Sequence, residues 1–140
     1  MIELIFVIVI LGILAAVAIP KFTATRDDAE VSRIARNIGT SMAEISSYAV
    51  SKGAANKDFL VMSNAMKSLK DTGNVTLSDN KAIILIDGSA CINVEVIKNT
   101  TNDDLLISFI NSTNSKCINL QTAIDAEKYP IKLRGASVTY

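Results

Sequence analysis

Two kinds of side chain in this sequence could do chemistry: a single carboxylate beside a long apolar run, and a pair of cysteines. Glu3 stands directly before the segment from Leu4 to Pro20, which has no charged residue. A carboxylate that reaches the interior of a membrane without a partner costs about 2.5 kcal/mol or more. Glu3 is therefore either an interfacial residue, stabilised by the helix dipole and by lipid headgroups, or a residue that needs a cationic partner from another chain.

Cys91 and Cys117 are the only cysteines in the chain. In an oxidising compartment they would form a disulfide that closes a loop of about 25 residues, and the loss of loop entropy in the unfolded chain would stabilise the fold by about 3.5 kcal/mol. The alternative is two buried thiols on neighbouring strands. Which form is present depends on whether the domain that carries them is exported.

Other kinds of chemistry have little support in the composition. The chain has no histidine, so it lacks the commonest general base and metal ligand, and Ser89 has no such base to activate it. Asn102, Asp103 and Asp104 lack the alternating spacing and the distal Glu of a calcium loop, and we interpret them as a hairpin turn. Basic and acidic residues balance at 14 each, and there is no Trp on which bases could stack. The sequence predicts no enzyme, no metal, no cofactor and no nucleic-acid partner.

The apolar run is long enough to cross a membrane as a helix. The seventeen residues from Leu4 to Pro20 make a helix of about 26 Å, which is close to the hydrocarbon thickness of a bilayer. Gly12 and Pro20 both weaken a helix, although such residues are commoner in membrane helices than in soluble ones. Pro20 could simply end the span. Because a helical pattern resumes directly after Pro20, we instead expect a kink or a locally melted turn inside one long helix.

The segment IELIFVIVILGILAAVAIPKF, Ile2 to Phe22, resembles the N-terminal segment of type IV pilins and of the pseudopilins of type II secretion. The resemblance rests on Glu3, on Gly12 within the run GILAAVAIP, and on Pro20 followed by a basic residue and a Phe. It covers about the first fifth of the chain. In the family the matching Glu is the fifth residue of the processed chain, whereas only Met1 and Ile2 precede it here. We therefore expect the true N-terminus to lie upstream of Met1.

The resemblance implies a subunit that assembles. A prepilin peptidase in the inner membrane would remove a short leader, the new N-terminus would be methylated, and Glu3 would pair with the amino terminus of a neighbouring subunit. Pilus assembly machinery would extract the chain, and the helix between Gly12 and Pro20 would be able to lose regular structure as the filament forms. A domain exported in this way meets oxidising conditions, so we expect the Cys91–Cys117 disulfide; in pilins a disulfide commonly staples the C-terminal surface loop.

The residues from Lys21 to about Lys52 keep a helical period. Apolar side chains at steps of three or four residues predict a stripe that faces the rest of the domain: Val31, Ile34, Ala35, Ile38, Met42, Ile45 and Ala49. Charged side chains occupy the opposite face: Arg26, Asp27, Asp28, Glu30, Arg33 and Arg36. These charges are either a solvated face with weak pairs, such as Glu30 with Arg33, or complementary contacts between adjacent subunits.

Beyond this helix we expect a shorter helix at about 58–71 and then an antiparallel sheet at about 75–140. Short β-branched runs separated by turn residues predict the strands Val75–Leu77, Ala82–Ile86, Cys91–Ile97 and Leu105–Ile110. Gly135 marks a turn before a last strand, Ala136–Tyr140. The expected fold is α+β, with 1–21 as the transmembrane or filament-core half of a long helix and 22–140 as a pilin-like globular domain.

These observations lead to one main interpretation and two alternatives. We expect a structural subunit of a type IV pilus-like filament, a homo-oligomeric helical assembly. A single pass would hold the subunit in the bacterial inner membrane before it joins an extracellular or periplasmic filament. A pseudopilin of a type II secretion system would share every feature of the first fifty residues. A periplasmic sensor or scaffold anchored by one span is the third interpretation, and it has no use for a Glu at the depth of Glu3.

Overall fold

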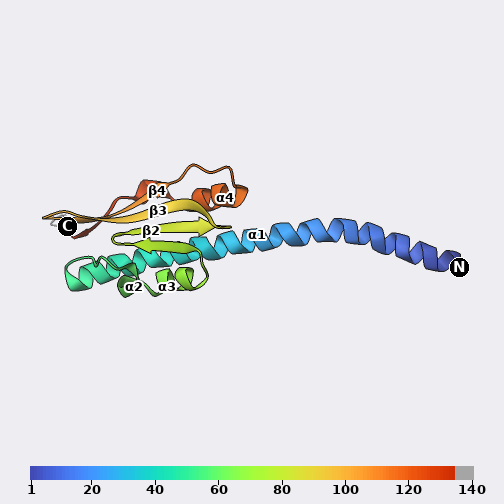
Figure 1. Ribbon diagram of the computed structural model, residues 1–140, viewed down its shortest axis with the longest axis horizontal. Helices are drawn as coiled ribbons and strands as arrows, with labels where there is room; N and C mark the ends of the chain where they lie inside the picture. The colour runs from blue at the N-terminus through green and yellow to red at the C-terminus, as the bar shows by residue number, and fades with distance from the viewer. Residues whose placement is uncertain (135–140) are drawn as a thin grey trace.

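One helix, α1 (Ile2–Lys52), runs the length of the molecule. The structure is a computed structural model that describes residues 1–134, and α1 accounts for 51 of them. The N-terminal half of α1 projects from the domain as an isolated, gently curved rod, and the C-terminal half carries all the other elements (Figure 1). The helix continues through Pro20 and ends at Gly53, whose φ of 73° is the left-handed conformation that glycine adopts without strain. The prediction of one long helix across Pro20 is confirmed, but the helix is unbroken around Pro20, so the alternative of a locally melted turn is wrong for this structure.

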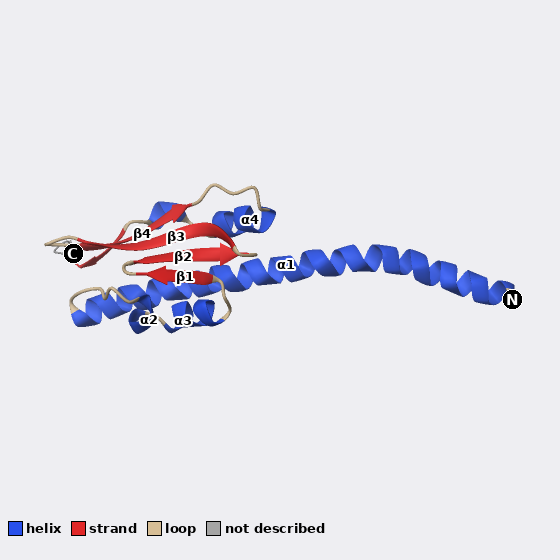
Figure 2. Ribbon diagram, in the orientation of Figure 1, coloured by secondary structure: helices blue, strands red, loops and turns tan. Residues whose placement is uncertain are grey.

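Five strands form an antiparallel meander in the order β1-β2-β3-β4-β5. The strands are β1 (Val75–Ser78), β2 (Lys81–Ile86), β3 (Ser89–Lys98), β4 (Asp103–Phe109) and β5 (Ile131–Arg134). Asp87 and Gly88 join β2 to β3 with φ of 49° and 75°, the conformation that a two-residue hairpin turn requires. The expected α+β class is confirmed, and Figure 2 shows the sheet lying along the C-terminal half of α1.

The helix expected at about 58–71 is two helices, α2 (Phe59–Met62) and α3 (Asn64–Asp71). They are separated by Ser63, which has extended backbone dihedrals of −144° and 122°. The Ser63 hydroxyl accepts a hydrogen bond from the Met66 N–H, so this residue caps a new helix instead of continuing the previous one. The prediction of a single helix was wrong because Ser63 lies inside an otherwise helical apolar pattern.

The region expected to be sheet from about 75 to 140 also contains helices. Between β4 and β5 lie α4 (Ser115–Ala123) and the 3-10 turn η1 (Ala126–Lys128). Asn114 caps α4, because its side-chain oxygen accepts a hydrogen bond from the Lys116 N–H at 2.9 Å. The predicted turn at Gly135 and the strand Ala136–Tyr140 lie outside the described residues.

The core lies between α1 and the inner face of the sheet. Six of the seven residues of the predicted stripe are buried, and Ala35 is partly buried against them. Opposite them lie alternate residues of the strands, among them Ile84, Val94 and Leu105, each fully buried. This packing attaches the globular domain to α1 from Val31 onward.

Candidate functional site

The first half of α1 is an apolar surface with no cover. All its residues from Ile2 to Phe22 are exposed, including large side chains such as Phe6, which is 66% exposed. Its most apolar stretch has a mean hydropathy of 3.1, and none of that stretch is buried. This helix is therefore long and apolar enough to span a membrane. An apolar surface of this size in water is unfavourable, so the segment requires lipid or other apolar helices around it.

Glu3 lies in the first turn of α1, where the helix dipole favours a negative charge. Its side chain is exposed, and the next charged residue along the helix is Lys21. The turn that carries it is closed by the Ile5 N–H, which donates to the Met1 carbonyl at 3.4 Å. The carboxylate is therefore presented at the outer end of the apolar segment, available to another molecule.

Gly12 and Pro20 are both within the continuous helix, so the structure does not bring them together with Glu3. A Cβ added at Gly12 would meet nothing within 4 Å, which means that no part of the described chain packs against this position. Pro20 has no N–H, so the carbonyl four residues earlier loses its helical partner. The hydrogen-bond ladder of α1 is therefore weakened just before the helix reaches the domain.

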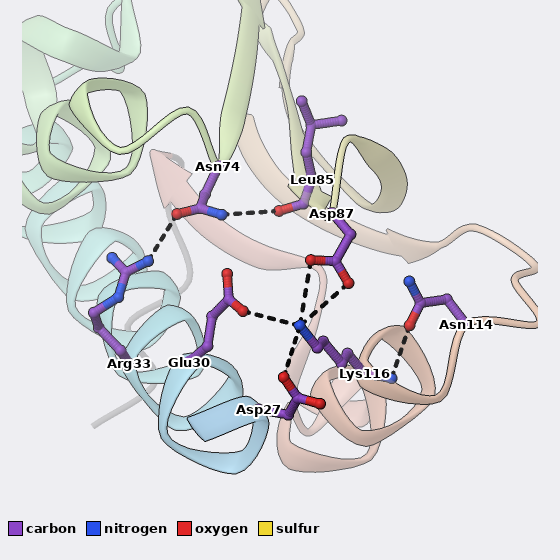
Figure 3. Close-up of polar contacts among 8 residues, drawn as sticks. All are labelled: Asp27, Glu30, Arg33, Asn74, Leu85, Asp87, Asn114 and Lys116. Atoms are coloured by element: carbon purple, nitrogen blue, oxygen red, sulfur yellow. Dashed lines mark hydrogen bonds and ion pairs between the residues drawn. The ribbon is translucent and has the colours of Figure 1, made fainter. Parts of the chain in front are cut away.

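Where α1 enters the domain, one lysine binds three carboxylates (Figure 3). The Lys116 ammonium of α4 lies 3.0 Å from Asp27, 3.2 Å from Glu30 and 3.3 Å from Asp87 of the β2–β3 turn. Hydrogen bonds to Asp27 and Glu30 raise the pKa of Lys116 above its ordinary value. We call these four residues the Lys116 cluster.

The Lys116 cluster corrects the interpretation of the charged face of α1. Glu30 pairs with Lys116 and not with Arg33, whose guanidinium donates to the Asn74 side-chain oxygen at 2.8 Å. Asn74 is buried and in turn donates to the Leu85 carbonyl at 3.4 Å, as Figure 3 shows. Part of the face that was interpreted as solvated, or as a contact between subunits, thus binds the domain of the same chain.

Cys91 and Cys117 form the expected disulfide, with their Cα atoms 5.6 Å apart. The alternative of two thiols on neighbouring strands is wrong, because the two sulfurs are bonded and because Cys91 is on β3 whereas Cys117 is on the helix α4. The Gln121 amide donates to the Cys91 carbonyl at 2.9 Å and to the Ile110 carbonyl at 2.8 Å. The disulfide and this amide together fix α4 to the sheet.

Asp103 has a structural role that its sequence context does not indicate. With Asp104 it belongs to β4 and not to a hairpin turn, and its side chain is buried. Its carboxylate accepts a hydrogen bond from the Ala55 N–H at 2.9 Å, and the Lys98 ammonium donates to the Ala55 carbonyl. Lys98 is the last residue of β3 and Asp103 the first of β4, so these two strands hold the segment that directly follows α1. Among the described residues, no group of three or more His, Cys, Asp or Glu side chains is arranged so that it could hold a metal ion.

Glu44, near the middle of the packed half of α1, binds the N-terminal end of the neighbouring helix α3. Its carboxylate accepts hydrogen bonds from the Ser63 hydroxyl at 2.6 Å and from the Ala65 N–H at 3.1 Å. The Ser63 hydrogen bond lowers the pKa of Glu44 most; burial opposes this effect, and the N–H groups of Ala65 and Asn64 add to it. A charge on α1 is therefore bound at the positive end of α3, which docks the two helices.

We expect Glu44→Gln to lower the free energy of unfolding by about 1 to 2 kcal/mol at neutral pH, because charge-assisted hydrogen bonds to the start of α3 are weakened. The pKa of Glu44 is lower in the folded chain than its ordinary value of 4.5. Its contribution is therefore complete well above pH 4.5 and is lost as the pH falls through the lowered pKa. Urea unfolding at pH 7 and pH 3 should show the difference between the two proteins shrinking at the acidic pH.

Glu127→Gln is the matched control, since Glu127 is exposed in η1 and changes the charge equally. It should move the unfolding midpoint little. A deficit of Glu44→Gln that is the same at both pH values would contradict the docking role of the carboxylate.

Comparisons with known protein families, with characterised proteins and with solved structures give no match to this chain. The likeness to pilins therefore rests on residues 2–22 themselves.

Proposed function

We propose that this chain is a structural subunit of a type IV pilus-like filament. The observation that carries the proposal is the division of α1 into two halves. One half is apolar on every side and exposed, and the other is packed rigidly into a domain. Parallel packing of the exposed halves would bury them in a filament core and place the sheet domains outside. The single pass in the inner membrane would hold the subunit until it is assembled.

Physical chemistry restricts what can drive such assembly. The exposed half of α1 has apolar surroundings both in lipid and in a filament core, so the hydrophobic effect supplies little net free energy for the transfer. Close packing and a specific polar contact must then set the register, and Glu3 is the charged group within the apolar half of α1. The assembly machinery implied by the resemblance would supply the work.

A pseudopilin of a type II secretion system is the alternative, because it would share every feature of the first fifty residues. The two differ in where the assembled chain is found, and this is measurable. Mass spectrometry of material sheared from the cell surface should contain the chain abundantly, with a processed and methylated N-terminus upstream of Ile2. A processed chain found only in the membrane fraction would favour the pseudopilin. An unprocessed chain in that fraction would favour a simple anchored domain.

We expect Glu3→Ala to abolish or disorder filaments while the chain still inserts into the membrane. The change would leave the cationic partner of Glu3 unpaired in an apolar environment, at a cost of about 2.5 kcal/mol, or between ten- and a hundredfold in subunit association. Electron microscopy of sheared material, together with membrane fractionation, measures both outcomes. Glu127→Ala removes a carboxylate from the exposed surface and should leave assembly normal. Normal filaments from Glu3→Ala would refute the proposed role of Glu3.

A further inference from the structure

The Lys116 cluster lies at the point where α1 leaves the domain. Val31 is the first buried residue of α1, and every described side chain before it is exposed or half-buried. Asp27 and Glu30, the two cluster residues on α1, lie within the turn that precedes Val31. The cluster therefore attaches α1 to the domain on the N-terminal side of the hydrophobic core, between Pro20 and Val31.

The position of Lys116 depends on a covalent bond to the sheet. Lys116 is next to Cys117, in the first turn of α4, and Cys117 is bonded to Cys91 of β3. With nine residues, α4 is too short to be stable as an isolated helix, so its place is set by its attachments. Asp87, the third carboxylate of the cluster, is four residues before Cys91, in the β2–β3 turn. The disulfide thus joins α4, which carries Lys116, to the strand that directly follows the turn carrying Asp87.

We propose that the Cys91–Cys117 disulfide is a redox-controlled latch on α1. While it is intact, it holds Lys116 against Asp27 and Glu30 and fixes residues 23–30 of α1 to the domain. Both sulfurs are buried, so a small dithiol reaches the bond when this part of the domain opens locally. On reduction the S–S bond breaks and each sulfur gains one electron and one proton, while the dithiol closes to its own disulfide. The Gln121 amide and the buried side chains of α4 still attach it to the sheet, but its first turn, which carries Lys116, shifts more easily, so the ion pairs of Lys116 weaken and residues 23–30 open more often.

The part of α1 affected is the part least supported by other contacts. Pro20 removes one hydrogen bond from the ladder on its N-terminal side, and the core begins only at Val31 on the other side. Local opening in a folded protein occurs where few buried contacts resist it. A change at Lys116 should therefore appear in residues 23–30 before it appears in the packed half of the helix.

Hydrogen exchange of the full chain in detergent micelles tests the latch, and it does not require a filament. Peptides covering 23–30 and 40–49 are compared with and without dithiothreitol, at labelling times of seconds to minutes. Reduction should speed exchange at 23–30 by roughly three- to tenfold, the range for the loss of partly exposed ion pairs. Residues 40–49 should stay protected in this window, because they exchange only when the whole domain unfolds.

Two variants separate the latch from a general loss of stability. Lys116→Met in the oxidised chain should reproduce the faster exchange at 23–30, and reduction should then add little. Lys128→Met removes an exposed lysine that pairs with Asp125 at 3.5 Å, and it should change nothing at 23–30. Unchanged exchange at 23–30 after reduction would overturn the proposal. Loss of protection at 40–49 within the same labelling window would overturn it too, because the whole domain would then be opening and residues 23–30 would have no separate opening of their own.

Discussion

Replacement of both Cys91 and Cys117 by alanine is expected to lower the free energy of unfolding by about 3.5 kcal/mol. The disulfide spans 26 residues, and without it the unfolded chain regains the entropy that this loop constraint removes. Both side chains are buried, so the lost packing of two sulfur atoms adds to this effect. Urea unfolding of the full chain in micelles, followed by circular dichroism, measures the change. A domain of this size has a total stability of about 5 to 15 kcal/mol, so the loss is a large fraction of it.

The unaltered chain in the presence of a dithiol is the matched control for the double alanine variant. It loses the same loop constraint but retains both sulfur atoms. The two proteins should therefore differ only by the packing contribution, and both should unfold at much lower urea than the oxidised chain. A loss below about 1 kcal/mol in the reduced chain would show that the unfolded state is already compact around these residues.

The long helix and its buried face could be predicted from the sequence because both depend on local spacing. Ile34, Ile38 and Ile45 recur at helical intervals, and each is essentially fully buried in the structure. The strands β1 to β4 were placed to within a few residues for a similar reason, since β-branched runs alternate with turn residues such as the Asp87–Gly88 pair, whereas β5 was not predicted. Patterns with a period of two or about four residues report directly on which face is buried.

The break at Ser63 was missed because two local signals compete there. Helical spacing continues across it from Phe59 through Met62 to Met66, which favours one helix. Serine, however, caps a helix when its hydroxyl accepts a hydrogen bond from the N–H three residues later, here that of Met66. Glu44 of α1 supports this cap, because its carboxylate accepts hydrogen bonds from the Ser63 hydroxyl and from the Ala65 N–H. The decisive partner lies 19 residues away, so no window around Ser63 contains it.

The polar contacts that connect distant elements had no signal in the sequence. Lys116 and Glu30 are 86 residues apart, and Asp103 and Ala55 are 48 residues apart. Asp27 and Glu30 were assigned to the face opposite the domain, and local spacing suggested Arg33 as the partner of Glu30, whereas both carboxylates bind Lys116 of α4. Tertiary contact overrides such an i,i+3 pair, because a pair exposed on a helix surface is worth only about 0.2 to 0.5 kcal/mol.

Phe59→Ala should cost about 3 to 5 kcal/mol of unfolding free energy, the largest effect expected from a single substitution in this chain. Phe59 is 1% exposed and belongs to α2, a helix of four residues that cannot be stable without tertiary support. Its burial holds the chain between the end of α1 and the start of α3. Urea unfolding measures the loss, with Val61→Ala as the control in the same helix, because Val61 is 54% exposed.

The same substitution tests whether α2 and α3 dock on α1 as a unit. The Ser63 N–H donates to the Phe59 carbonyl at 3.0 Å, and the Ser63 hydroxyl donates to Glu44, so these residues share one corner of the domain. Residues that share partners show coupling of about 0.5 to 3 kcal/mol in a double-mutant cycle. Phe59→Ala combined with Glu44→Gln should therefore cost less than the sum of the two changes. Strict additivity would mean that Phe59 anchors α2 alone and that Glu44 holds α3 independently of it.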